Sequence, residues 1–270
     1  MTEFIYKNTK QAKEIIAAQN EDGLWGNFHS LAAPKKDGFT TEQALRKLQI
    51  LGYEISDPPI AKTVNFMSDC LSKHKTMPDK REKSHDWDVF TELMLATWIR
   101  RFTYECAEAN RIAQVWSAII TDTFSNGEYN HEVYLRSYEK YFGKKAKGGR
   151  LVDFVSFYQI SLVGGILDEK TDSRVVDYLL NKSDGIYYIY DICLSQTPKD
   201  FASKNAVRYL AALELISKFL SREKLHFAVE WLNGNKNKNG KWDMGKSARD
   251  NIYFPLSDKF LPFCFHRQYN

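Results

Sequence analysis

Apolar residues recur at intervals of three and four along most of the 270-residue chain, and the strict alternation typical of half-buried strands is scarce. This periodicity predicts an all-α protein. The expected helices cover residues 10–18, 40–52, 57–71, 88–102, 107–124, 152–167, 173–180, 203–220 and 223–232. The segments 126–150 and 187–200 and the tail after Gly245 are expected to be irregular.

Residue types at the ends of these segments support the prediction. Thr40 and Gln43 have the spacing of a capping box, in which each side chain accepts a hydrogen bond from the other residue's backbone N–H. Gly52 is a natural stop for that helix. The next helix opens at Asp57, and the two prolines that follow stand in its first turn, where a missing N–H does no harm.

A short motif recurs after several of these helices: Asp or Asn, then Gly, any residue, and Trp or Tyr. Its copies are Asp22-Gly23-Leu24-Trp25, Asn126-Gly127-Glu128-Tyr129, Asp184-Gly185-Ile186-Tyr187 and Asn239-Gly240-Lys241-Trp242. Asp/Asn-Gly supplies the left-handed turn that ends a helix, and we expect the aromatic ring to cover the junction between neighbouring units. The glycines are 104, 58 and 55 residues apart, which predicts one lost copy near 74–79. About five helix-pair units of roughly 50–60 residues then make a single domain over 1–270.

Composition narrows the class of partner. The 38 basic and 34 acidic residues are mixed along the chain, so no nucleic-acid partner is predicted. No apolar run approaches the length of a membrane-spanning helix, and the four cysteines are far apart without a CxxC pair. These features are typical of a protein of the reducing cytoplasm. The many aromatic residues suit either a cavity for a bulky apolar ligand or an ordinary core.

The recurring motif resembles the repeat of the α/α-toroid class, which includes squalene and terpenoid cyclases and the protein prenyltransferases, and the chain is similar to a bacterial subgroup of that class. QNEDGLWG at 19–26 resembles the class's glutamine–tryptophan motif, and AVEWLNGNKNKNGKWDMG at 228–245 resembles a second copy with Asn in place of Gln. FTTEQALRKLQILGYE at 39–54 matches the class's layout, in which a capped helix follows the motif. The resemblance implies an α/α toroid (barrel) around a central cavity, with inner helices starting near 40, 88, 152 and 203.

The class II cyclases of this class use an Asp-any-Asp-Asp motif as proton donor. In SHDWDV at 84–89, Asp86 and Asp88 match two of its positions and Val89 replaces the final acid. The resemblance therefore implies that Asp86 and Asp88 are catalytic, with Trp87 stabilising a cation. The alternative is that both acids cap a helix and complement its dipole.

The prenyltransferases instead use a zinc site with an Asp-and-Cys motif, which has no match around the four cysteines, so no metal is predicted. The class also binds diphosphates through basic residues. Gly148-Gly149-Arg150 precedes a predicted helix that carries Asp153 and Tyr158, and Lys204 and Arg208 stand one turn apart near the start of another. Asp88 and Glu92 share a helix face, where they would hold Mg²⁺ with a diphosphate or belong to an ion-pair network.

Two functions follow from these patterns. The first is a toroid that binds, or transforms, a bulky apolar or isoprenoid-like ligand in a central cavity. The second is a non-catalytic helical-repeat scaffold that binds peptides or proteins, since stacked helix pairs present broad grooves. The pattern leaves open whether the protein is an enzyme.

Overall fold

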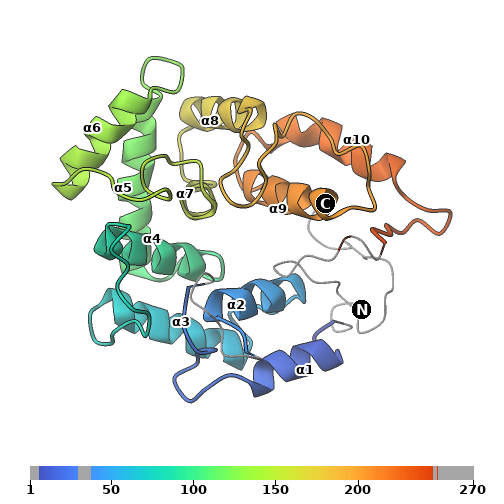
Figure 1. Cartoon of the computed structure of the whole chain (residues 1–270), viewed down its shortest axis with the longest axis horizontal. Coiled ribbons are helices and arrows are strands. Elements are labelled where there is room, and N and C mark those ends of the chain that lie inside the picture. Colours follow the sequence, from blue (N-terminus) through green and yellow to red (C-terminus); the bar gives the residue numbers. More distant parts are fainter. Residues whose placement is uncertain (1–5, 30–37, 246–247, 249–270) are drawn as a thin grey trace. The chain divides into compact units, whose positions relative to one another are not determined.

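The computed structural model describes residues 6–29, 38–245 and 248, and within them the chain is helical (Figure 1). Isolated bridges pair Ser156 with Tyr187 and Ile186 with Tyr190. The predicted all-α class is confirmed. The α-helices are α1 (Lys10–Ala17), α2 (Thr41–Ile50), α3 (Pro58–Leu71), α4 (Trp87–Arg100), α5 (Ala107–Thr123), α6 (His131–Phe142), α7 (Phe157–Val163), α8 (Glu169–Asn181), α9 (Lys204–Ile216) and α10 (His226–Gly234), and a 3-10 helix covers Arg222–Leu225.

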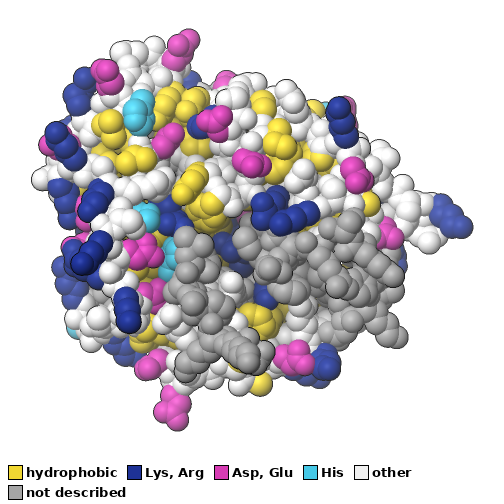
Figure 2. All heavy atoms as spheres, viewed as in Figure 1, with side chains coloured by type: hydrophobic (Ala, Val, Ile, Leu, Met, Phe, Trp, Pro, Cys, Tyr) yellow, Lys and Arg dark blue, Asp and Glu magenta, His cyan; other side chains and the backbone are white. Residues whose placement is uncertain are grey.

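The described surface carries charges of both signs. Lys and Arg side chains lie among Asp and Glu side chains on the face shown in Figure 2. Within the described ranges, no helix is both long and apolar enough to cross a membrane.

The chain forms two compact units. Unit 1 comprises residues 1–80, 199–207 and 232–270 and contains α1, α2 and α3. Unit 2 comprises residues 81–198 and 208–231 and contains α4 to α8. Helices α9 and α10 each contribute residues to both units.

Local sequence signals set most helix starts. The capping box of α2 is formed: Thr40 Oγ1 accepts from Gln43 N at 3.4 Å, and Thr40 N donates to Gln43 Oε1 at 3.1 Å. Asp57 stands at the N-cap of α3, but its carboxylate instead accepts from Lys7 Nζ and from Glu54 N, both at 2.7 Å. The cap position was predicted correctly, and tertiary contacts decide what its side chain binds.

Helix α6 lies in a segment that the sequence analysis predicted to be irregular. Asn130 caps it by accepting from Val133 N at 3.0 Å, and Gly143 ends it with a φ of 68°. Tyr134, Tyr138 and Phe142, at four-residue spacing, give it an apolar face, and Tyr134 and Tyr138 are fully buried. These signals are present in the sequence, and the prediction that 126–150 is a long connection was wrong for residues 131–142.

Helix α7 is shorter than predicted, because it covers only Phe157–Val163 of the expected 152–167. Residues before it bond elsewhere: Val155 N donates to the Asp153 carboxylate at 3.3 Å, and Val155 O accepts from Tyr187 N at 3.0 Å. Gly165, with a φ of 79°, lies just beyond its other end. Contacts with a distant segment therefore replace the first turns of the expected helix.

The first and last copies of the recurring motif, both in unit 1, fold identically. In each, the glycine has a left-handed φ, 89° at Gly23 and 68° at Gly240, and its N–H donates to the carbonyl of the Asn three residues earlier. That Asn also caps the turn with its side chain, at 2.9 Å in the first copy and 3.1 Å in the last. In each, the Trp indole N–H donates to the carbonyl ten residues earlier, Trp25 to Ile15 at 2.5 Å and Trp242 to Leu232 at 2.6 Å.

This bond explains why a turn at the end of a helix carries tryptophan. The ring lies back against the helix that precedes it, and its N–H is a second donor to a carbonyl of the last turns, which also accepts from the backbone N–H three residues on: Ala18 N to Ile15 O at 3.2 Å and Asn235 N to Leu232 O at 3.1 Å. Trp25 is 2% exposed. The two motif copies are therefore one structural device used twice.

The two middle copies share the turn but not the ring position. Gly127 and Gly185 have φ values of 103° and 63°, and each donates to the carbonyl three residues earlier. Tyr129 packs among Phe124, Phe154 and Tyr178, whereas Tyr187 is 47% exposed. The prediction of a covering aromatic thus describes Tyr129 and not Tyr187.

The structure also places a turn of the same kind where the motif is lost. Lys73 follows α3, has a left-handed φ of 62°, and donates from its N–H to Cys70 O, three residues earlier, at 3.1 Å. It stands just before the predicted interval 74–79. Together with the four motif glycines it gives a series of five left-handed corners, at residues 23, 73, 127, 185 and 240, which follow α1, α3, α5, α8 and α10. Gly52, Gly143 and Gly165, just after α2, α6 and α7, also have a left-handed φ and stand outside this series.

Unit 2 is built around α4, which packs against α5 and α7, while α5 also packs against α6 and α7. Most side chains of α4 are buried, as expected for a helix that is apolar nearly all round. Trp98 of α4 and Trp116 of α5 are fully buried in this core.

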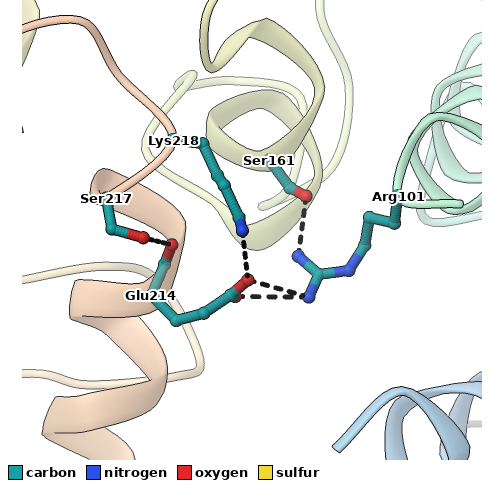
Figure 3. Close-up of polar contacts among 5 residues, drawn as sticks. All are labelled: Arg101, Ser161, Glu214, Ser217 and Lys218. Carbon is teal, nitrogen blue, oxygen red and sulfur yellow. Dashed lines mark hydrogen bonds and ion pairs between the residues drawn. The ribbon is translucent and has the colours of Figure 1, made fainter. Parts of the chain in front are cut away.

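A polar network joins the C-terminal ends of three helices of unit 2 (Figure 3). Arg101, which ends α4, donates to Ser161 Oγ of α7 at 3.0 Å and to the Glu214 carboxylate of α9 at 3.2 and 3.3 Å. Lys218 lies 3.7 Å from the same carboxylate. Because Ser161 and Glu214 lie in the last turns of their helices, the C-terminal ends of α4, α7 and α9 lie close together around Arg101.

Candidate functional site

Several predicted site residues of unit 2 meet around Phe90 in the second turn of α4. The Phe90 ring centroid lies 5.9 Å from that of Trp87, 5.3 Å from that of Tyr158 and 5.4 Å from the Arg150 guanidinium carbon. His85, which the sequence analysis did not select, stacks on the same ring at 5.2 Å. The structure therefore brings Trp87, Arg150 and Tyr158 into one aromatic cluster.

Arg150 is the unusual member of the cluster because it is a cation and only 4% exposed. Its guanidinium lies between Phe90 and the Tyr188 ring, whose centroid is 5.2 Å away, and Nη1 donates to His85 Nε2 at 3.2 Å. Its Nε is buried without a hydrogen-bond partner. No ion pair joins it to a carboxylate of the described residues. A buried cation without an anion is unfavourable, and the planar N–H edge of arginine suits an oxyanion.

Two glycines allow the backbone before Arg150 to approach the cluster. Gly148 has a φ of 99°, and a Cβ there would lie 2.3 Å from the His85 ring. A Cβ on Gly149 would lie 3.1 Å from the Tyr187 hydroxyl. The side-chain amide of Gln159 in α7 donates to Arg150 O at 2.5 Å. These contacts fix the Arg150 backbone against both α4 and α7.

His85 connects the buried arginine to a carboxylate. Its Nδ1 lies 3.0 Å from Glu82 Oε2 and 3.0 Å from Ser84 Oγ, while Nε2 accepts from Arg150. The His85 side chain is 9% exposed. Glu82, His85 and Arg150 thus form a continuous chain of polar contacts.

Tyr188, whose ring also lies near the Arg150 guanidinium, has an unfavourable backbone conformation. Its φ is 51°, in the left-handed region that residues other than glycine, Asn and Asp rarely adopt. Such a conformation costs roughly 1–3 kcal/mol and persists only when the surroundings enforce it. The sequence carried no sign of it, because a tyrosine in a segment expected to be irregular has no distinguishing pattern.

The two predicted catalytic acids lie in different surroundings. Asp86 is the N-cap of α4: Oδ1 lies 2.9 Å from Lys144 Nζ, and Oδ2 is buried without a partner. Asp88 is 59% exposed and makes a bidentate ion pair with Arg81 at 2.9 and 3.0 Å. Asp86 therefore faces the protein interior, whereas Asp88 faces solvent.

Glu92 does not share a site with Asp88. It lines a cleft of about 20 Å³ against α5, with Arg111 and Trp116 among the other lining residues. No group of three or more His, Cys, Asp or Glu side chains in the described ranges has the geometry to hold a metal ion. Asp88 is paired with Arg81, so the two carboxylates have different neighbours.

The remaining predicted binding residues are dispersed. Asp153 accepts from the Tyr129 hydroxyl at 3.2 Å, and burial, with the nearby Asp153 carboxylate as second cause, raises the pKa of Tyr129. Lys204 is exposed in the first turn of α9, and Arg208, one turn later, is partly buried. Asp153 thus supports the aromatic cluster at the Asn126 corner and does not contact Arg150.

A separate surface cleft of about 290 Å³ lies where the end of α5 meets α6. It contains none of the predicted site residues. Its lining residues are Asp122, Ser125, Val133, Arg136, Ser137 and Lys140.

Comparison with protein-family models, with curated proteins and with solved structures found no match to this chain.

Proposed function

We propose that this chain is an α/α-toroid protein that binds the anionic head of a bulky apolar ligand, of the isoprenoid diphosphate kind, at Arg150. The observation that carries the proposal is the Arg150 guanidinium, which is 4% exposed, enclosed by Phe90 and Tyr188, and without a carboxylate partner among the described residues. The resemblance to the toroid class led to the same residue from sequence.

The repeated corners support the architecture. A closed circle of helix pairs requires similar units joined in the same way, and the five left-handed corners fall at intervals of 50 to 58 residues. The network at Arg101 adds support from unit 2, since α4, α7 and α9 are the helices expected in the inner ring and their C-terminal ends meet there.

The chemistry of the cluster suits a ligand with two parts. The unpartnered Nε–H lies on the edge of the guanidinium that binds two oxygens of a phosphate side by side. The Tyr188 ring beside it is partly exposed and offers apolar surface to a hydrocarbon chain, and the Phe90 and Tyr158 rings of the same cluster are buried. Arginine with aromatic neighbours therefore favours an amphiphilic anion over a purely apolar molecule.

Among the catalytic candidates, Asp86 is the one whose position suits a role at this cluster, because its Oδ2 is buried and unpartnered. Its other oxygen is engaged in the ion pair with Lys144, 2.9 Å away. The proposal is therefore ligand binding, with Asp88 acting as a surface partner of Arg81.

The test compares inorganic pyrophosphate, farnesyl diphosphate and farnesol by titration calorimetry and by heat protection. We expect farnesyl diphosphate to bind more tightly than either fragment. At a ligand concentration of 100 times Kd, binding adds about 2.7 kcal/mol of stability, which raises the melting midpoint by roughly 5–10 °C for a chain of this size.

Two arginine variants give the test a matched control. Arg150→Gln removes the proposed anion contact. Arg100→Gln removes an arginine that is 9% exposed, stacks on Tyr104 and has an equally unpartnered Nε, but lies at the far end of α4. Only Arg150→Gln should abolish pyrophosphate binding, and Arg150→Lys should weaken it at least about tenfold because lysine lacks the planar fork.

The proposal fails if a folded Arg150→Gln protein, verified by its urea unfolding curve, binds farnesyl diphosphate as tightly as the unmodified chain. Absence of binding by all three probes would instead favour the alternative function of a non-catalytic scaffold.

A further inference from the structure

The protonation state of His85 follows from its partners. A guanidinium can only donate, so His85 Nε2, 3.2 Å from Arg150 Nη1, must accept and carries no proton. In the neutral ring the proton is then on Nδ1, which lies 3.0 Å from the acceptor Glu82 Oε2. His85 is therefore held as the Nδ1–H tautomer, with its Nε2 lone pair directed at the arginine.

This arrangement opposes an anion at Arg150. An oxyanion that also reaches Nη1, the nitrogen in contact with His85, would face the Nε2 lone pair and would compete with it for an Nη1 proton. If Nε2 gains a proton, it becomes a donor to the same oxyanion, and the cluster of Glu82, His85 and Arg150 changes from net neutral to one positive charge. Glu82, already in contact with Nδ1, stabilises the imidazolium.

We infer that His85 is a second anion-recognition residue beside Arg150, and that an oxyanion binds there together with one proton, which His85 Nε2 takes up. The inference rests on the proposed anion site and adds to it a donor and a dependence on pH. Sulfate, phosphate and diphosphate groups all have the oxygens that such a pair of donors requires.

The groups around His85 are consistent with this exchange. Glu82 and Ser84 lie on its own segment, Arg150 comes from the turn before α7, and Phe90 of α4 covers one face of the ring. The next carboxylate along the chain, that of Asp86, is already paired with Lys144. Glu82 is an acid in contact with the imidazole, and Arg150 is a cation in contact with it.

The experiment measures proton uptake on the unmodified protein. Sulfate is the probe, because its charge does not change between pH 6 and pH 8, and titration calorimetry in two buffers of different ionisation enthalpy counts the protons taken up. We expect about one proton per sulfate bound at the pH where His85 is neutral in the free protein. Affinity should rise by up to about tenfold for each unit that the pH falls in that range.

Two histidine variants identify the group. In His85→Gln the side-chain carbonyl still accepts from Arg150 but takes up no proton, so sulfate binding should become independent of pH and proton uptake should fall to zero. His131→Gln alters another histidine of unit 2, which contacts Tyr129, and should leave the uptake at about one. The proton count on the unmodified protein does not depend on either variant folding.

The outcomes separate the two proposals. Sulfate binding without proton uptake overturns the role of His85 and leaves the Arg150 site standing. Proton uptake that persists in His85→Gln also overturns it. If neither sulfate nor pyrophosphate binds at pH 6 or at pH 8, the anion site itself is wrong, and the role of His85 falls with it.

Discussion

Lys73→Gly is expected to stabilise the protein, although it removes a side chain. Lys73 holds the left-handed conformation that glycine holds at the other four corners, with a φ of 62°. Its side chain is exposed and makes no hydrogen bond or ion pair with the described residues, so little is lost when it is removed. The substitution therefore isolates the cost of the backbone conformation.

The magnitude follows from two opposing terms. A left-handed conformation costs an L-residue with a Cβ roughly 1–2 kcal/mol, which glycine avoids. Glycine loses about 0.5–1 kcal/mol more conformational entropy on folding. The free energy of unfolding should rise by about 0.5–1 kcal/mol, which corresponds to a melting midpoint higher by about 1–4 °C.

Urea unfolding followed by circular dichroism measures the change, with Lys238→Gly as the matched control. Lys238 is an exposed lysine in the last corner, and its φ is not left-handed. Its replacement should lower the free energy of unfolding by about 0.5–1 kcal/mol, the entropic cost alone. If both variants lower the free energy of unfolding equally, Lys73 does not have a left-handed backbone conformation. The series of corners would then lack its member at residue 73.

Trp25→Phe should lower the free energy of unfolding by about 0.5–1.5 kcal/mol in urea, because it removes the hydrogen bond from the buried indole to Ile15 O, which keeps only its backbone donor Ala18 N. Trp242→Phe should cost less because Trp242 is partly exposed, and equal costs would contradict the buried position of Trp25. Glu214→Ala should lower the free energy of unfolding by about 1–3 kcal/mol, because the Glu214 carboxylate pairs with the mostly buried Arg101. Lys218→Ala should lower it by less than about 0.5 kcal/mol, because the Lys218 amine is half-exposed. The reverse order in thermal unfolding would contradict the network. Burial lowers the pKa of the Lys47 amine from 10.5 to about 8. As the pH rises, the native chain therefore loses this proton at a lower pH than the unfolded chain does. The free energy of unfolding should consequently rise by about 1–3 kcal/mol between pH 8 and pH 10.5. In Lys47→Met that rise should disappear from urea midpoints measured across the range.

Features that depend on a few neighbouring residues could be predicted from the sequence. The Thr40 capping box, the starts of most helices and the left-handed turns at Gly23 and Gly240 are all as expected. Each is decided within about four residues, because a cap or a turn satisfies its own hydrogen bonds locally. The aromatic residue after the glycine was recognised for the same reason, since it acts on the helix just before it.

The grouping of the candidate site could be predicted only in part. Arg150 was selected because it precedes a predicted helix, Trp87 because it stands in the SHDWDV motif, and Tyr158 as the apolar part of an anion pocket. In the structure all three lie around Phe90. His85 was passed over because its partner Arg150 lies 65 residues further along the chain. No periodicity or spacing in the sequence reports a contact of that separation.

The sequence by itself determined the helical class and the repeated corner, because both arise from interactions within single turns of the backbone. The tertiary structure alone decided that Asp88 pairs with Arg81 at the surface while Arg150 is buried beside His85. It also decided that the helix expected from residue 152 begins only at Phe157, because Val155 O accepts a hydrogen bond from the distant Tyr187 N. Burial and charge pairing depend on which distant segments meet, and that is settled by the packing of the whole unit.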